Sequence, residues 1–572
     1  MLLIYLYGHM NVANINSLVY LGNRAVMWSE IFEIKEIDLF GRTGTIYTKH
    51  GKVSTPTLTP VINPAKSVLE PKEIHEMGFN LLMTNSYIIK QSYGDLALEV
   101  GVHGILGVDT PVITDSGAYQ LMVYGRVKVE PREIVEYQVK IGSDIGVILD
   151  IPTKKETPYS QVKEEVEETL RRAREAVKIE RNGMLLVGPV QGGTYLNLVA
   201  YSASELSKLP FDVYAVGGPT QIMENYMFRD LVRLVMTARL NLPWSAPLHL
   251  FGAGHPMLIP LAVAMGVDTF DSASYVLYAR DDRLLTDRGT LRLNELEELP
   301  CDCPVCSRIT AKELRELPKQ ERIPLIAKHN LYVILREIKR TRPAIHEGRL
   351  WELVEEKART HPSMMDAFQE FVKYTRFLSK KHPVTRAVPS GIFFYSGMSR
   401  YRPEVVRHIE RLKHRVQRSK DTLILFQETP QKPFTRFGLI KELLNAYPDM
   451  WELGDLVVLS SVFSVIPLEL DGVYPLSQYE TSSKVFIDAW HELTSDVAWY
   501  VLEKEYSIVI LVYYDLYEPF INELEHRLKF EGILFGKVKV DDYYQALSNV
   551  DELARNIKSM VETLKSFKEK KN

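Results

Sequence analysis

Eight short apolar runs recur between Thr55 and Ser274, and a turn and an amphipathic stretch follow each of them. The runs are TPTLTPVINP, FNLLMTNS, TPVITDSG, IGVILDIP, GMLLVGPVQGG, VYAVGG, PLHLFGAG and DTFDSAS. Stretches such as QVKEEVEETLRRAREAVKIE carry apolar residues at three- and four-residue spacing, as helices covering a sheet do. Eight βα units predict an α/β fold, a closed parallel (β/α)8 or TIM barrel. An open doubly wound sheet is the alternative, but no GxGxxG follows the first run to support its dinucleotide-binding form.

The character of the sequence changes outside this repeat. We expect a poorly ordered N-terminal arm at residues 1–30, a barrel domain with a metal subdomain at 31–345 and a charged helical linker at 346–385. Residues 386–572 contain new apolar runs alternating with helical stretches: GIFFYSG, TLILFQ, DLVVLSSVFSVIPLEL, YSIVILVYYD and GILFGKVKV. These predict a separate C-terminal α/β accessory domain.

Composition limits the classes of protein to consider. The 572 residues carry a formal net charge of −4, which is unusual for a protein devoted to nonspecific nucleic-acid binding. No stretch approaches the ~18 consecutive apolar residues of a membrane span, and the first ten residues lack the basic start of a signal peptide. The three cysteines lie between positions 301 and 306, which excludes a disulfide-stapled secreted scaffold and favours the cytoplasm.

Polar residues end several of the predicted strands. Asp115, Asp150, Gln191, the Gly217–Gly218 pair and Asp271 come at the carboxyl ends of their runs. In a (β/α)8 barrel these ends converge on one mouth, where reacting groups are found. Each aspartate alone is better explained as a helix cap, but three of them together with an amide and a diglycine predict a site.

Two of these carboxylates suit chemistry at a sugar carbon. One of Asp115 and Asp271 could attack C1′ and form a covalent glycosyl-enzyme, while the other donates and then removes a proton. A sugar-cleaving glycosidase would use the same pair, so this pattern alone leaves both reactions open.

The remaining residues favour a planar base over a polyol. Asp150 can accept from an exocyclic amine and a ring N–H, and Gln191 can both donate and accept. Gly217 and Gly218 allow close approach of the backbone, although a tight loop explains them equally well. Tyr119 offers a face on which a ring could stack, with core packing as its alternative.

The cysteine cluster predicts a metal site. Cys301, Cys303 and Cys306 lie in one tight turn, and His329 follows in a helical segment. Three thiolates and an imidazole are a common tetrahedral set for structural Zn²⁺, and they leave no open position for catalysis.

These motifs together carry a family resemblance. TDSGAYQ, LDIP, VQGG, AVGGP, HLFGAGHP, FDSASY and the CxCxxC with a later histidine resemble the tRNA-guanine transglycosylases of the archaeal branch, in the family's order and over residues 31 to 345. The resemblance implies a TIM barrel with one structural zinc that exchanges a guanine in tRNA for a 7-deazaguanine by double displacement. It further implies Asp271 as nucleophile and Asp115 as general acid and base, with the reverse assignment open. Base binding is implied for Asp150, Gln191, Gly217 and Gly218, stacking for Tyr119 and a further contact for Ser116.

The resemblance also implies partners. They are tRNA, guanine and 7-cyano-7-deazaguanine (preQ0), with position 15 of the D-loop as target on the pathway to archaeosine, and with a homodimer as the assembly. No PUA-type RNA-binding domain is recognisable at the C-terminus, which suggests a separate RNA-binding subunit or a different clamp. His408, Arg411, Lys413 and Arg415 could face phosphates, or could be a solvated helix face. The alternative function is a noncatalytic or divergent tRNA-binding relative, similar to archaeosine synthase; it would be marked by loss of either aspartate or of the metal ligands.

Overall fold

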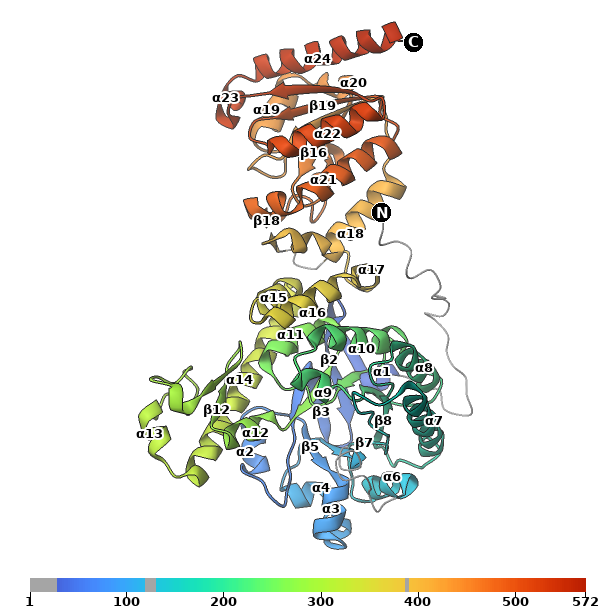
Figure 1. The fold of residues 1–572 in the computed structure, drawn as a ribbon, viewed down its shortest axis with the longest axis vertical. Helices are drawn as coiled ribbons and strands as arrows, with labels where there is room; N and C mark the ends of the chain where they lie inside the picture. The colour runs from blue at the N-terminus through green and yellow to red at the C-terminus, as the bar shows by residue number, and fades with distance from the viewer. Residues whose placement is uncertain (1–27, 119–129, 386–389, 572) are drawn as a thin grey trace. The chain divides into compact units, whose positions relative to one another are not determined.

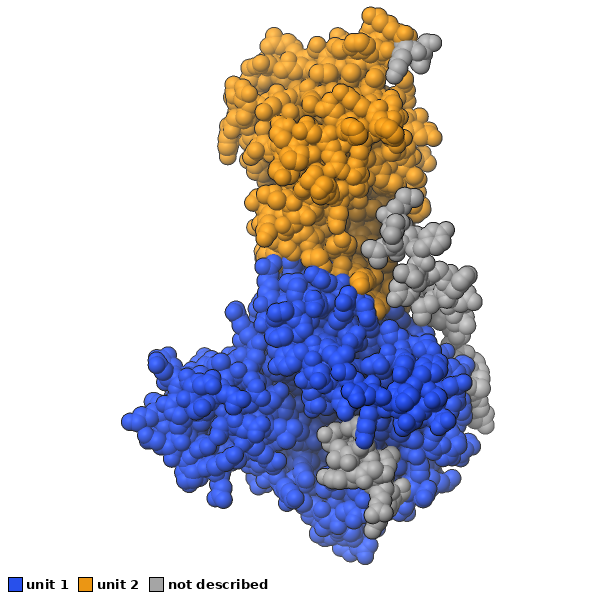
Figure 2. All heavy atoms as spheres, in the orientation of Figure 1, with its two compact units in different colours: residues 1–371 blue, residues 372–572 orange. Residues whose placement is uncertain are grey.

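The computed structural model describes residues 28–118, 130–385 and 390–571. The chain divides into two compact units, residues 1–371 and 372–572, which are coloured separately in Figure 2. Most of the predicted N-terminal arm and the candidate Tyr119 lie outside the described residues. The boundaries expected at 345 and 385 stay predictions.

The first unit contains an eight-stranded parallel sheet, which confirms the predicted barrel (Figure 1). Its strands, one from each of the eight apolar runs, are β4 (Thr57–Pro60), β5 (Leu82–Asn85), β6 (Val112–Asp115), β7 (Ile145–Val147), β8 (Leu185–Val190), β9 (Val213–Val216), β10 (Leu248–Leu250) and β11 (Thr269–Ser272). The spatial order is β4-β11-β10-β9-β8-β7-β6-β5. The two end strands meet through one parallel bridge, Val61 with Met83, and this bridge brings the sheet round on itself.

Helices connect the strands and cover the outside of the sheet (Figure 1). They are α2 (Pro71–Glu76), α3 (Ser86–Tyr93), α4 (Leu96–Leu106), α6 (Pro131–Lys140), α7 (Tyr159–Ala176), α8 (Leu196–Leu206), α9 (Thr220–Glu224), α10 (Phe228–Leu240), η1 (Pro256–Leu258) and α11 (Ile259–Ala264). Helix α7 illustrates the principle, because its buried residues Val162, Val166, Leu170 and Ala173 recur every three or four positions. The apolar stripe therefore faces the sheet and the charges face solvent.

A small antiparallel sheet precedes the barrel and closes one of its ends. It consists of β1 (Phe32–Asp38), β2 (Gly41–Thr48) and β3 (Gly51–Thr55), after the short α1 (Trp28–Ile31). Phe32, Ile46 and Val53 are buried in one cluster with the apolar residues of the barrel strands. The amino-terminal end of the barrel is thus filled, and chemistry is left to the carboxyl end.

The segment after β11 forms the arm that carries the cysteines. It comprises α12 (Ser274–Arg280), β12 (Arg283–Leu285), β13 (Thr290–Arg292), η2 (Leu293–Glu295), α13 (Ala311–Glu316) and α14 (Lys319–Glu347), followed by α15 (Leu350–Ala358) and α16 (Pro362–Val372). A capping box begins α13, where Thr310 accepts from the Glu313 N–H and Glu313 accepts from Thr310. Gly348, in the left-handed conformation, ends α14.

The second unit is an α/β domain, as predicted. A five-stranded sheet has the order β17-β16-β15-β19-β20, in which only β17 is antiparallel. Its strands are β15 (Thr422–Gln427), β16 (Asp455–Ser460), β17 (Ser464–Pro467), β19 (Ile508–Tyr513) and β20 (Leu534–Lys539), and a separate parallel pair joins β14 (Ile392–Phe394) to β18 (Tyr479–Thr481). Alternate residues of β15 belong to two different hydrophobic cores. Ile424 and Phe426 lie in the first core, and Leu423 and Leu425 lie in the second, so the sheet is buried on both faces.

Helices complete the second unit, and the longer ones among them pack against the two faces of this sheet. They are α17 (Thr375–Leu378), η3 (Gly397–Tyr401), α18 (Pro403–Arg415), α19 (Gly438–Ala446), α20 (Met450–Leu453), η4 (Leu468–Leu470), α21 (Ser483–Glu503), α22 (Glu518–Phe530), α23 (Tyr543–Ser548) and α24 (Val550–Lys571). Of the four residues on α18 that could face phosphates or solvent, His408 does neither, because it is buried and its Nε2 lies 2.7 Å from the Val465 carbonyl oxygen. No helix in the described parts of the chain has the length and apolarity to span a bilayer.

Candidate active site and metal centre

The carboxyl ends of the barrel strands bring the predicted polar residues together. Asp115 ends β6, Asp150 follows β7 and Gln191 follows β8, whereas Asp271 is the last residue but one of β11. The negative charges of Asp150 and Asp271 both raise the pKa of Asp115, as is expected for three carboxylates at the same end of one barrel. This convergence is what parallel strands in a closed barrel produce.

Asp115 is a carboxyl group that keeps its proton near neutrality. Removal from water and, to a smaller extent, the negative charges of Asp150 and Asp271 together raise its pKa to about 7, although backbone hydrogen bonds from Gly117 and Ser116 oppose the shift. Asn85, its register partner on β5, donates from Nδ2 to Asp115 Oδ2 over 2.8 Å. The group is therefore positioned and poised for proton transfer at neutral pH.

Asp150 and Gln191 form a buried polar pair. Gln191 Nε2 donates to Asp150 Oδ2, and burial raises the pKa of Asp150 to about 6 against the opposing effects of that bond and of the Arg172 charge. Gln191 Oε1 is buried and accepts no hydrogen bond from any described residue. A buried acceptor without a donor is costly, so a ligand N–H is the partner that this position calls for.

The diglycine makes room for that pair. A Cβ at Gly217 would lie 2.2 Å from Gln191 Nε2, and Gly218 has a φ of +72°, with Gln191 Oε1 3.7 Å from its ideal Cβ. Glycine is thus required beside the Gln191 amide at both positions. Gly217 leaves space for the amide, and Gly218 adopts a backbone conformation that favours glycine.

Asp271 is held by two donors on a single oxygen. Its Oδ1 lies 3.0 Å from His249 Nε2 and 2.9 Å from the Gly252 N–H. No hydrogen bond from a described residue reaches Oδ2. One oxygen of the carboxylate is therefore fixed, and the other is left for a reacting atom.

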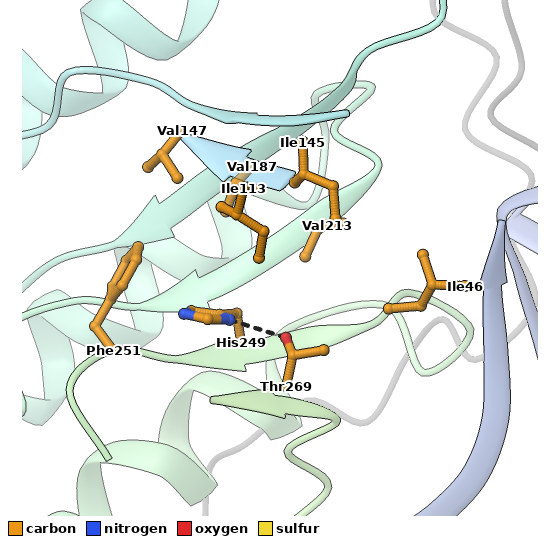
Figure 3. A pocket seen from close by; sticks show the side chains of 9 residues that line it. All are labelled: Ile46, Ile113, Ile145, Val147, Val187, Val213, His249, Phe251 and Thr269. Carbon is orange, nitrogen blue, oxygen red and sulfur yellow. Dashed lines mark hydrogen bonds between the residues drawn. The ribbon is translucent and has the colours of Figure 1, made fainter. Parts of the chain in front are cut away.

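His249 projects from β10 into the interior of the barrel (Figure 3). The ring lines a cavity of about 10 Å³ among side chains that are mostly apolar, and its Nδ1 lies 2.9 Å from Thr269 Oγ1. When the Thr269 hydroxyl donates to Nδ1, the proton of the neutral ring is on Nε2, which can then donate to Asp271.

The sequence analysis missed His249 and Asn85. His249 stands in the run PLHLFGAG, and Asn85 stands in FNLLMTNS, so both were absorbed into predicted strands. The available signal is a polar side chain within an apolar barrel strand, because such a residue must find a partner across the strands.

The other two predicted residues have different outcomes. Ser116 is buried, and its hydroxyl donates to the Ile148 carbonyl oxygen over 3.0 Å, which ties β6 to the segment after β7. Tyr119 lies outside the described residues, so its stacking stays a prediction.

The cysteine cluster has the geometry of a four-ligand metal centre. His329 Nδ1 lies 3.3 Å from Cys301 Sγ, 3.6 Å from Cys303 Sγ and 3.2 Å from Cys306 Sγ, and Cys301 Sγ lies 3.7 Å from Cys306 Sγ. A tetrahedral ion with about 2.3 Å bonds to sulfur and 2.0–2.1 Å to nitrogen requires edges of roughly 3.5–3.8 Å. The group can therefore hold one metal ion with little rearrangement.

The helix that carries His329 is anchored to the end of β4. His329 Nε2 lies 2.9 Å from the Leu285 carbonyl oxygen, and a metal-ligating histidine is typically oriented through its second nitrogen in this way. Asn330 accepts from the Leu285 N–H and donates to the carbonyl of Tyr275, whose hydroxyl in turn donates to the Val61 carbonyl oxygen at the end of β4. The metal arm is thus connected to the barrel mouth next to Asp271.

Comparison with known proteins agrees with this architecture. The family model described as queuine tRNA-ribosyltransferase matches residues 38–363. A tRNA-guanine(15) transglycosylase of Methanocaldococcus jannaschii is 45% identical over 461 residues, which are 78% of this chain and 68% of that protein. The tRNA-guanine(15) transglycosylase of Thermococcus kodakarensis is 47% identical over 73% of this chain and 70% of its own length. That of Saccharolobus solfataricus is 40% identical over 84% of this chain and 96% of its own length. The chain therefore belongs to the tRNA-guanine transglycosylases, a family of glycosyltransferases.

Proposed function

We propose that the protein replaces guanine at position 15 of tRNA with 7-cyano-7-deazaguanine by double displacement, the first step on tRNA toward archaeosine. The observation that carries this proposal is that the charges of both Asp150 and Asp271 act on Asp115 at the carboxyl ends of the barrel strands. The relatives named tRNA-guanine(15) transglycosylase support position 15.

In the first displacement, Asp271 attacks C1′ of the target ribose. Its Oδ2 is the attacking atom, because Oδ1 is bound to His249 and Gly252. A C1′–O bond forms as the C1′–N9 bond of guanine breaks, and Asp115 gives its proton to the departing base. A carboxyl with a pKa of about 7 is suited to this donation.

In the second displacement, the incoming base reverses these events. Asp115 takes the N9 proton, N9 attacks C1′, and the bond to Asp271 breaks, so the configuration at C1′ is retained. Asp150 and the unpartnered Gln191 Oε1 accept hydrogen bonds from the edge of either base, with Gly217 and Gly218 beside them. His249 acts as a positioning residue, since it fixes the carboxylate of Asp271 without itself reaching the reacting atoms.

The metal centre has a structural role in this proposal. Cys301, Cys303, Cys306 and His329 hold one Zn²⁺, and all four positions are filled by protein. The Cys303→Ser substitution is expected to lower the melting temperature and the zinc content before it changes the turnover of the protein that remains folded. Calorimetry with metal analysis measures this, and an unchanged melting curve in metal-free protein would refute the structural role.

The reaction is tested by incubating tRNA that carries labelled guanine with the enzyme and preQ0. Label should leave the tRNA only when preQ0 or guanine is supplied, and mass spectrometry of digested tRNA should place preQ0 at position 15. Release of guanine without incorporation of a base would instead favour a glycosidase. Exchange at another position would retain the chemistry and overturn the assignment of position 15.

The partners follow from the substrate. They are tRNA, guanine and preQ0, met in the cytoplasm. A homodimer and a separate RNA-binding subunit stay predictions, for which size measurement of the protein with and without tRNA is the direct test.

A further inference from the structure

A second group of metal-ligating side chains lies at the amino-terminal end of the barrel, away from the proposed active site. Asp144 immediately precedes β7 and is buried. His50, in the turn between β2 and β3, has its Nδ1 3.0 Å from Asp144 Oδ1, and His103 of α4 has its Nε2 3.0 Å from Asp144 Oδ2. The two imidazole centroids are 3.9 Å apart. Side chains from three separate elements thus converge on one point.

Two other aspartates occupy the equivalent place before alternate strands. Asp144, Asp212 and Asp268 precede β7, β9 and β11, and each accepts an N–H from the neighbouring strand, namely that of Val112, Leu186 or Leu248, over 2.8–2.9 Å. All three carboxylates are buried. The position is therefore a repeated structural device that ties adjacent strands together.

The three aspartates differ in their counter-charge. Asp212 pairs with Arg181, and Asp268 pairs with Arg42. Asp144 faces two histidines instead, and no Lys or Arg of the described residues lies within ion-pair distance of it. At this position two ring nitrogens therefore stand where the two counterparts have a guanidinium group.

We propose that Asp144, His50 and His103 bind a divalent transition-metal ion of the Zn²⁺ class, as a second metal site separate from the Cys3His group. The ion supplies the positive charge that arginine supplies at the other two positions. Two imidazoles and one carboxylate are a ligand set that such ions prefer.

The geometry fits with small adjustments. The three ligand atoms lie within 4.8 Å of one another, and a tetrahedral ion with bonds of about 2.0–2.1 Å requires spacings of roughly 3.3–3.4 Å. The His50 side chain is 34% exposed, which leaves a path for the ion and open positions for water.

Cobalt titration of the full-length protein tests the proposal, using chain whose Cys3His group is already filled with Zn²⁺. One further equivalent of Co²⁺ should bind and give visible d–d absorption without the near-ultraviolet band of a cobalt thiolate. The His50→Ala and His103→Ala variants should each weaken this binding by at least about tenfold. Thermal melting of each variant identifies any loss of fold.

His491→Ala is the matched control. His491 Nδ1 also lies 3.0 Å from a carboxylate, that of Glu523, but it has no second histidine in its group. The control should bind Co²⁺ as the unaltered chain does. Absence of a second equivalent, a thiolate band alone, or equal binding by folded His50→Ala and His103→Ala protein would each overturn the proposal.

Discussion

Buried aspartates at the two ends of the barrel have opposite electrostatic environments. At the amino-terminal end, Asp212 and Asp268 have strand N–H groups and arginines as partners, so their charges are compensated. At the carboxyl end, Asp115 and Asp150 share a mouth in which burial raises the pKa of both. The same residue type at opposite strand ends thus serves stability in one case and, in the proposed function, reactivity in the other.

The aspartates at the two ends also differ in how many of their carboxylate oxygens accept hydrogen bonds. Asp268 takes hydrogen bonds on both oxygens, from Arg42 and from the Leu248 N–H. Asp271, three residues further on, takes its bonds on Oδ1 alone, and Gln191 Oε1 has no donor among the described residues. Groups left with free capacity mark where a substrate is expected, and the following substitutions test this division.

Asp271→Asn is expected to have the largest effect. It should reduce guanine exchange by at least about 10³-fold, because the nucleophilic oxygen is replaced by an amide, while the melting temperature changes little. Labelled guanine incorporation into tRNA measures the loss. The exposed Asp281→Asn serves as control and should keep full activity. Exchange at the normal rate by the Asp271 variant would show that another group is the nucleophile.

Asp268→Asn should show the reverse pattern. Removing this carboxylate leaves the buried Arg42 without its ion-pair partner, which typically costs about 3–5 kcal/mol. Denaturant unfolding measures this loss, and activity per folded molecule should be retained. Asp230→Asn, which breaks a half-exposed pair with Arg233, should change stability by less than about 0.5 kcal/mol. A stable but inactive Asp268 variant would contradict the purely structural role that we assign to this carboxylate.

Gly217→Ala should act on base binding alone. The added Cβ would displace Gln191, whose Nε2 lies 2.2 Å from its position, and we expect KM for the free base to rise about 10- to 100-fold. Gly289→Ala, where no atom lies within 4 Å of the added Cβ, is the matched control. An unchanged KM would place the base elsewhere in the mouth.

Asp115→Asn should change how stability depends on pH. Folded Asp115 keeps its proton up to a pH of about 7, whereas the unfolded carboxyl loses it near 3.8, so the unaltered protein loses stability as pH rises between these values. The variant lacks this loss, so at pH 8 it should be more stable than the unaltered protein. The expected gain in free energy of unfolding is on the order of 1 kcal/mol, a small value because the mouth is partly solvated. Unfolding at pH 4 and pH 8 measures the difference. The free energy of unfolding of the variant minus that of the unaltered chain should be larger at pH 8 than at pH 4. A smaller difference at pH 8 would contradict the raised pKa of Asp115.

The sequence predicted the barrel because each strand is a short apolar run ended by a polar or small residue. It predicted the convergence of Asp115, Asp150 and Asp271 because parallel strands must end at one face. It did not predict the partners of these groups. The contact of His249 with Asp271 depends on register between β10 and β11, and that of His50 with Asp144 joins positions 94 residues apart. Such pairs follow from the closed barrel, which a local pattern does not specify.

The junction between β4 and β5 has a consequence for local opening of the barrel. These strands share a single bridge, whereas even the short β6–β7 and β10–β11 pairs share two register pairs. Fewer backbone bonds lower the free energy of local opening, so amide exchange should be fastest along this line. Since β4 pairs with the strand of Asp271 and β5 pairs with that of Asp115, the line of weakest backbone pairing in the barrel runs between the strands that neighbour these two carboxylates.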